Sequence, residues 1–140
     1  MLYFSASFLL GIILVLPYLI LAHRLVLNRA VQFLSSGLVV AALIYVGLAV
    51  WRDTAWMGVE TVGVIAYGMC AILAIRHSIL WLSLGWGLHP LWDVALHWLG
   101  PGSHVVPAWY AIACVSFDLA VAGYVGWLWQ SGKPPSAEPG

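Results

Sequence analysis

The chain has 140 residues, of which 64% are hydrophobic and only 7% are charged, and it carries no formal net charge. A soluble domain has about 25% charged residues and buries only part of its surface, so this composition excludes a water-soluble fold and requires lipid around the protein. With zero net charge and a sequence pI of about 6.9, nothing in the composition indicates the basic face that nucleic-acid binding needs, and we expect no nucleic-acid partner.

Five apolar stretches follow one another along the chain. Each is close to the ~20 residues that cross a hydrocarbon core as a helix, and the runs are too long and continuous for barrel strands. We therefore predict an all-α, polytopic transmembrane bundle of about five helices, over residues 2–22, 30–51, 57–75, 79–99 and 108–129. The third helix is the weakest prediction because it is short and contains Glu60. Residues 1–130 are expected to form one domain, followed by a disordered polar tail over 131–140.

The distribution of lysine and arginine predicts the orientation of the bundle, because these residues favour the cytoplasmic side of a membrane. If the N-terminus is outside, four basic residues lie in inner segments and one lies in an outer segment: Arg24, Arg29, Arg76 and Lys133 against Arg52. The sequence therefore predicts an N-out/C-in, multi-pass protein of the cell membrane, which we assign to the bacterial inner membrane.

Three ionisable residues stand in the fourth predicted helix, within the stretch "GWGLHPLWDVALHW" at residues 85–98. His89, Asp93 and His97 are spaced by four and therefore share one helical face. An aspartate facing the centre of a bilayer costs about 2.5–3.5 kcal/mol even on a lenient insertion scale, so this face must point into the bundle. Pro90 removes a backbone hydrogen bond and is expected to kink the helix.

Polar groups of three helices reach matching depths when the helical rise of 1.5 Å per residue is applied. Two groups lie near the outer surface, one lies roughly 9 Å below it and three lie roughly 15 Å below it. In that order they are Glu60 and His97, then Asp93, then Tyr67, His89 and Asp118. We therefore predict one outward-facing polar cleft, in which the five ionisable residues are catalytic candidates and three aromatic residues contact an apolar ligand: Trp86, Trp92 and Tyr67.

The sequence leaves three interpretations of this cleft open. The ionisable groups can handle protons or perform acid–base chemistry on an apolar ligand such as an isoprenoid or another lipid, because intramembrane His–Asp pairs mark proton relays and substrate cavities. They can instead hold helices together in a structural or accessory subunit, although such contacts contribute only about 0.6 kcal/mol on average.

The third interpretation is a metal ion held by Asp93 together with His89 or His97 and completed by Glu60 or Asp118. The two histidines lie roughly 12 Å apart along the helix axis, so one ion cannot bind both. No diagnostic metal motif is present, and the sequence requires no cofactor.

From about Tyr67 onward, the chain resembles a bacterial family of uncharacterised small integral membrane proteins, a domain of unknown function. Its pattern G-W-x-L-H-x-x-W-D-x-x-x-H is matched at Gly85, Trp86, Leu88, His89, Trp92, Asp93 and His97. Further similarities are Arg76, Glu60 and the segment from Cys114 to Asp118. Trp98 stands where a second histidine is expected, which weakens the metal interpretation, and Pro90 replaces a small polar residue. The resemblance implies a polytopic membrane protein and supplies no activity.

Besides membrane lipid and an apolar small-molecule ligand, a second copy of the chain is an expected partner. Small residues four positions apart favour close helix–helix contact in membranes. The last helix contains two such pairs: Ser116 with Ala120, and Ala122 with Gly126.

Overall fold

The computed structural model describes residues 2–132; residue 1 and residues 133–140, with nearly all of the predicted polar tail, lie outside the described part. Within that part the fold is all-α, as predicted, with no strand. Its five α-helices are α1 (Leu2–Arg24), α2 (Leu27–Arg52), α3 (Met57–Arg76), α4 (Leu80–Trp92) and α5 (Ala108–Ser131). A short 3₁₀ helix, η1 (Thr54–Trp56), precedes α3, and a π-helix, η2 (Asp93–Trp98), continues α4.

Four helical segments are long and apolar enough to cross a membrane: Leu2–Arg24, Leu27–Arg52, Thr54–Arg76 and Ala108–Ser131. The third predicted helix is therefore confirmed as one of the long helices. The fourth is divided, because α4 has 13 residues and passes directly into the six residues of η2. The last helix runs to Ser131, and Gly132 ends it in the left-handed conformation (φ 57°) that glycine adopts without steric cost.

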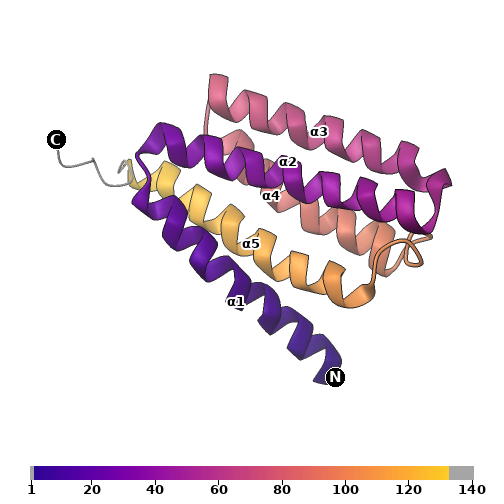
Figure 1. Cartoon of the computed structure of the whole chain (residues 1–140). Helices are drawn as coiled ribbons and strands as arrows, with labels where there is room; N and C mark the ends of the chain where they lie inside the picture. The colour runs from indigo at the N-terminus through magenta and orange to yellow at the C-terminus, as the bar shows by residue number, and fades with distance from the viewer. Residues whose placement is uncertain (1, 133–140) are drawn as a thin grey trace.

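The helices form a bundle in which α4 lies against both α3 and α5 (Figure 1). α1 packs mainly on α5, and α2 packs mainly on α3. Although α1 and α2 follow each other along the chain, they touch little and diverge from their connection toward the N-terminus.

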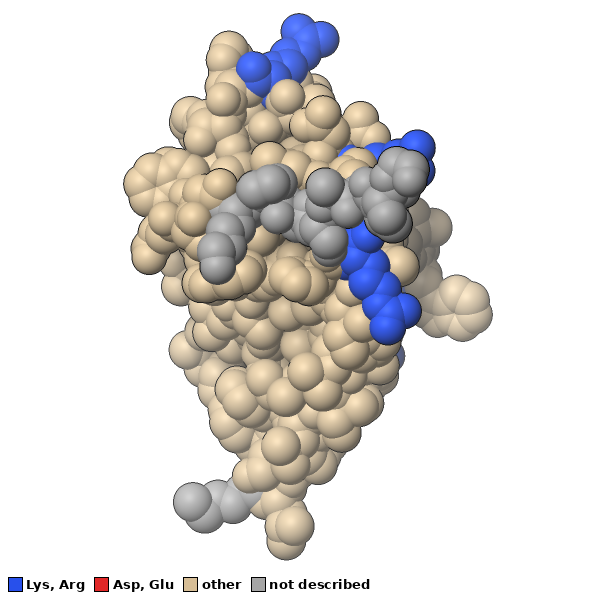
Figure 2. All heavy atoms as spheres, turned by 90° about the vertical axis from the view of Figure 1, so that its left-hand side faces the viewer, with Lys and Arg blue, Asp and Glu red and all other residues tan. Residues whose placement is uncertain are grey.

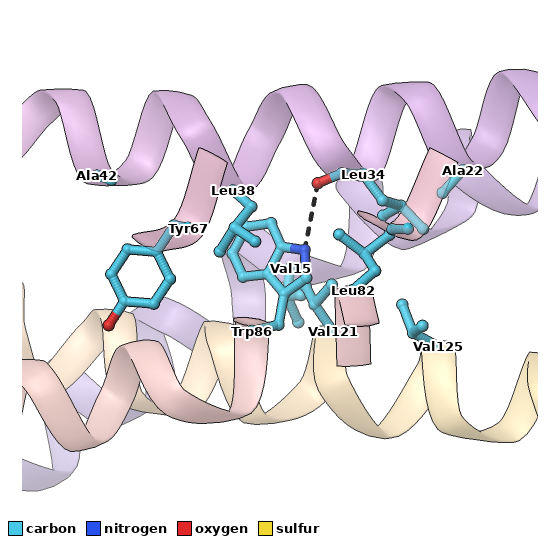
Figure 3. Packing of buried hydrophobic residues seen from close by; sticks show 11 residues of the cluster. Val15, Ala22, Leu34, Leu38, Ala42, Tyr67, Leu82, Trp86, Val121 and Val125 are labelled. Atoms are coloured by element: carbon cyan, nitrogen blue, oxygen red, sulfur yellow. Dashed lines mark hydrogen bonds between the residues drawn. The ribbon is translucent and has the colours of Figure 1, made fainter. Parts of the chain in front are cut away.

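The core of the bundle is centred on Trp86 of α4, whose side chain is 1% exposed (Figure 3). The indole Nε1–H donates a hydrogen bond to the backbone carbonyl of Leu34 in α2, at 3.2 Å. Leu38 and Val121 pack around the ring from α2 and α5. Because lipid tails are as apolar as these side chains, close packing and this hydrogen bond hold the helices together more than removal from water does.

The predicted small-residue pairs of α5 face neighbouring helices of the same chain. Ser116 Oγ donates to the carbonyl of Phe8 in α1 at 2.8 Å. Ser83 Oγ of α4 donates a hydrogen bond to the carbonyl of Ala122 at 2.9 Å, and this hydroxyl also lies close to Gly126. These pairs therefore mark contacts within the chain, and homo-oligomerisation stays a prediction.

Basic residues gather at one end of the bundle. Arg24 ends α1, Arg76 ends α3 and Arg29 lies in the first turn of α2. The view onto this end shows basic side chains and no acidic ones (Figure 2). The positive-inside rule associates such an end with the cytoplasmic side.

Candidate functional site

The site is built around a break in α4. Pro90 has no backbone N–H, so the carbonyl four residues earlier loses its helical partner. The Asp93 N–H reaches back to the carbonyls of both His89 and Pro90, and from there the chain follows the wider π-helix of η2. At its end the Leu99 N–H donates to the carbonyl of Val94, five residues earlier, at 2.9 Å. Segments of π-helix inside α-helices frequently mark functional sites.

His89, Asp93 and Asp118 form what we call the central cluster. His89 Nδ1 lies 2.8 Å from Asp118 Oδ2 and 3.6 Å from Asp93 Oδ2. One ligand-type atom from each residue falls within 4.8 Å of the other two. The side chains are only 1%, 0% and 2% exposed, respectively. Two acids and one imidazole are thus enclosed together, with α4 and η2 on one side and α5 on the other.

Two tyrosine rings cover the central cluster. Tyr67 of α3 lies 4.9 Å from the His89 ring and Tyr45 of α2 lies 5.4 Å from it, measured between ring centroids. The Tyr45 hydroxyl is beside Asp93 but makes no well-aligned hydrogen bond, and neither carboxylate oxygen of Asp93 has such a partner among the described residues. Buried polar atoms normally have hydrogen-bond partners, so this part of the cluster has unused bonding capacity.

Glu60 and His97 form a second buried pair. His97 Nε2 lies 3.2 Å from Glu60 Oε1, close enough for an ion pair although not aligned for a hydrogen bond. The other imidazole nitrogen, Nδ1, lies 3.3 Å from the Gly102 carbonyl, to which it can donate. The Trp92 indole N–H points to Glu60 Oε2 at 3.5 Å. The Tyr45 ring lies 5.0 Å from the His97 ring, so Tyr45 separates this pair from the central cluster.

The six polar residues predicted from helix depth are therefore all buried, none more than 5% exposed. They do not line one open cleft. They divide into the central cluster with Tyr67 beside it, and the Glu60–His97 pair. His89, Asp93 and His97 are equally spaced along α4 and η2 but do not form one group. The wider π-helical turn changes the direction in which His97 points.

An apolar hollow of about 400 Å³, which we call the lateral groove, lies between α1, α2 and α5. Leu14 of α1 and Val40 of α2 are among its walls and are about half exposed on the side of the bundle. Trp86 and Asp118, both buried, belong to its inner wall, together with Cys114. The groove therefore leads from the apolar flank of the bundle to one carboxylate of the central cluster.

The three predicted ligand contacts do not share one cavity. Trp86 lines the lateral groove, whereas Tyr67 and Trp92 line a second hollow of about 440 Å³ between α3 and the α4–η2 helix. Trp92 is additionally tied to Glu60 by its indole N–H.

Two tyrosines of the site were missed by the sequence analysis. Tyr45 lies between the two buried groups, and Tyr18 lines the lateral groove with a buried hydroxyl that has no hydrogen-bond partner in residues 2–132. The depth estimate could have identified Tyr45. It lies seven residues before the end of its helix, which places it roughly 10 Å below the outer surface and level with Asp93. Nothing in the spacing of Tyr18 distinguishes it from a core aromatic residue.

A surface pair connects the loops at the end of the bundle opposite the three arginines. His104 Nε2 lies 2.9 Å from Asp53 Oδ2, and the Ala55 N–H also donates to the Asp53 carboxylate. The hydrogen bond from His104, followed by that from Ala55, lowers the pKa of Asp53 below its ordinary value. The Asp53 carboxylate therefore stays ionised as the pH falls into the range where a free aspartate becomes protonated.

The fold and the site define a class of protein: a helical bundle of membrane-spanning type with a buried His/Asp cluster. A family model described as a family of unknown function (DUF6010) matches residues 6–133, and the chain belongs to this family. The predicted membership of such a family is thus confirmed, and the match extends over the N-terminal helices as well. No curated protein and no solved structure matches the chain significantly.

Proposed function

We propose that this protein is a multi-pass protein of the bacterial inner membrane that binds an apolar ligand and performs acid–base chemistry on its polar end. The observation that carries the proposal is the double role of Asp118. Its side chain belongs to the wall of the lateral groove, and it accepts a hydrogen bond from His89 in the central cluster. A molecule in the groove would therefore meet the cluster at this residue.

The groove favours a ligand that enters from the bilayer. Ligand pockets have volumes of about 300–1,000 Å³ and mainly apolar walls with few polar groups, a description that the lateral groove satisfies. Its exposed wall residues lie on the flank of the bundle, which faces lipid in a membrane-spanning orientation. A lipid or isoprenoid can place its chain along these walls and its polar end near Asp118 and the Tyr18 hydroxyl.

The central cluster is suited to proton transfer because one imidazole faces two carboxylates. A proton on His89 Nδ1 is held by Asp118 at 2.8 Å and lies 3.6 Å from Asp93. General acid–base catalysis requires such a group within hydrogen-bonding reach of the reacting proton. We assign proton exchange with the ligand to Asp118, relay of the proton to His89, and storage of charge to Asp93. Glu60 and His97 are the candidate residues through which protons reach the side of the membrane where the N-terminus lies, which we take to be the outside.

A groove-filling variant tests ligand binding. Ala41 lines the groove, so Ala41→Phe should fill part of it, and the purified protein should lose most of the lipid-soluble molecule that co-purifies with wild type. The matched control is Leu43→Phe on the same helix, where the native side chain is 48% exposed and lies outside the groove. The measurement is mass spectrometry of an organic extract. Equal amounts of the molecule in both variants, or none in wild type, would contradict binding in the groove.

A second test separates chemistry from interhelical attachment. Asp93→Asn and His89→Gln preserve shape and hydrogen bonding while removing groups that titrate, so both should accumulate as folded protein without activity. The readout is rescue of any phenotype caused by deletion of the gene, with protein abundance measured by immunoblot. Leu84→Ala, at a 46% exposed position of α4, is the packing control and should rescue fully. Full rescue by both cluster variants would show that the cluster only holds helices together.

A further inference from the structure

We infer that the central cluster is the binding site of one divalent transition-metal ion, with His89 Nδ1 and the carboxylates of Asp93 and Asp118 as its protein ligands. The inference concerns the same residues as the proposed function and rests on it only for the role of the ion. Among the combinations that the sequence leaves open, this set is the one that joins His89 and Asp93 to Asp118 and uses neither His97 nor Glu60.

The spacing of the three ligands fits an ion between them. Zinc lies about 2.0–2.2 Å from imidazole nitrogen and carboxylate oxygen, so tetrahedral ligand atoms are roughly 3.3–3.5 Å apart. His89 Nδ1 is 2.8 Å from one carboxylate and 3.6 Å from the other, and the three ligand atoms lie within 4.8 Å of one another. Side-chain movements on the order of 1 Å would bring the three atoms to this spacing.

Charge balance also favours a divalent ion. Two ionised carboxylates beside a neutral imidazole carry two negative charges, and a protonated imidazole cancels only one of them. A divalent cation cancels both, which leaves a neutral assembly in a region where uncompensated charge is costly. Within residues 2–132 no Lys or Arg side chain contacts either acid, so no permanent cation of this part of the chain balances their charge.

The unused polar atoms provide independent support. Asp93 is fully buried, and both of its carboxylate oxygens lack a well-aligned hydrogen-bond partner. A metal ion would supply the missing partner for one oxygen. The Tyr45 hydroxyl, which is also buried and lies beside Asp93, could then donate to the other oxygen and orient it. Metal-bound carboxylates commonly have such outer hydrogen bonds.

The ligand set restricts the metal and suggests its use. One imidazole and two carboxylates suit Zn²⁺, Fe²⁺ or Mn²⁺, whereas thiolate-rich sites select other ions. Three protein ligands leave at least one coordination position free, as in catalytic rather than structural zinc sites. Because Asp118 also lines the lateral groove, a ligand there could present a carbonyl or phosphoryl oxygen to the ion. The ion would then polarise that carbonyl or phosphoryl group.

Metal content and a cobalt spectrum test this site. The full chain is purified in detergent, stripped with EDTA, desalted, and loaded with Zn²⁺ or with Co²⁺ as a spectroscopic probe. We expect about one ion per chain and visible Co²⁺ absorption characteristic of a low-coordinate site. Asp93→Asn and Asp118→Asn each replace a ligand, so they should weaken metal affinity at least as much as the roughly 10–100-fold that loss of an outer hydrogen-bond partner of a ligand costs.

The matched control is Glu60→Gln, which removes a buried carboxylate from the other pair and should retain the ion. Gel filtration verifies that every variant is folded. Substoichiometric metal in wild type, or equal occupancy in wild type and both aspartate variants, would overturn the site. The groove variant Ala41→Phe separates the two proposals, because it should lose the lipid-soluble ligand and keep the metal. Ligand binding without metal would leave the proposed function intact and refute this inference.

Discussion

In metal-free protein, His89→Ala should lower the free energy of unfolding by about 3–5 kcal/mol, the usual cost of removing one partner from a buried ion pair. The substitution leaves two carboxylates buried together, at 0% and 2% exposure, without the imidazole that donates to Asp118 and lies 3.6 Å from Asp93. His89→Gln should cost only about 1 kcal/mol, because an amide N–H can still donate to Asp118. The difference between these two variants reports how much a neutral N–H donor and a filled volume at position 89 stabilise the protein.

Reversible unfolding in mixed micelles, or steric trapping in bicelles, measures these free energies. His104→Ala is the control, since His104 belongs to an ion pair at the surface and is 54% exposed. Exposed ion pairs contribute little to stability, so this variant should unfold like wild type. Equal losses for His89→Ala and His89→Gln would contradict this prediction, because neither the volume nor the neutral N–H of glutamine would then replace the imidazole.

The number and the class of the helices could be predicted because they depend on local composition. A bilayer requires about 20 apolar residues per helix, and the runs that meet this requirement correspond to α1, α2, α3, α5 and the α4–η2 helix. The inward direction of Asp93 was predictable for the same reason, since the cost of exposing a carboxylate to lipid does not depend on the partner helix.

The division of the site into two buried groups could not be predicted from spacing. Helical periodicity places His89, Asp93 and His97 on one face, but it assumes a regular α-helix. Pro90 predicts a kink without saying that the next six residues continue as a π-helix. Nor does the sequence place Tyr45 between the groups, because this contact depends on how α2 is rotated against its neighbours.

The lateral groove depends on an interhelical angle, which is a property of contacts distant in sequence. A short connection joins α1 to α2, and two helices joined in this way ordinarily pack side by side as antiparallel neighbours. It packs on α5 instead, where Ser116 Oγ binds the Phe8 carbonyl. Glycine at position 11 permits this close approach, but the sequence alone does not identify its partner.

Gly11→Ala should therefore destabilise the protein by about 1–3 kcal/mol, the range observed when a methyl group is forced into a tightly packed contact. A Cβ atom at position 11 would overlap the backbone carbonyl oxygen of Ala113 and Ser116 Oγ. A backbone atom cannot rotate away as a flexible side chain can, so α1 must move off α5. The bond from Ser116 to the Phe8 carbonyl should lengthen or break as a result.

Gly123→Ala is the matched control, because a Cβ atom there meets open space in the middle of α5. Alanine stabilises a helix relative to glycine by up to about 1 kcal/mol, so this variant should be as stable as wild type or more stable. Gly11 also lines the lateral groove, and a displaced α1 should change the groove's width and lower the amount of bound ligand. Unfolding free energy and extracted ligand are measured on the same preparations. If Gly11→Ala matched Gly123→Ala in both, α1 would not be held against α5 by this contact, and the groove could not depend on it.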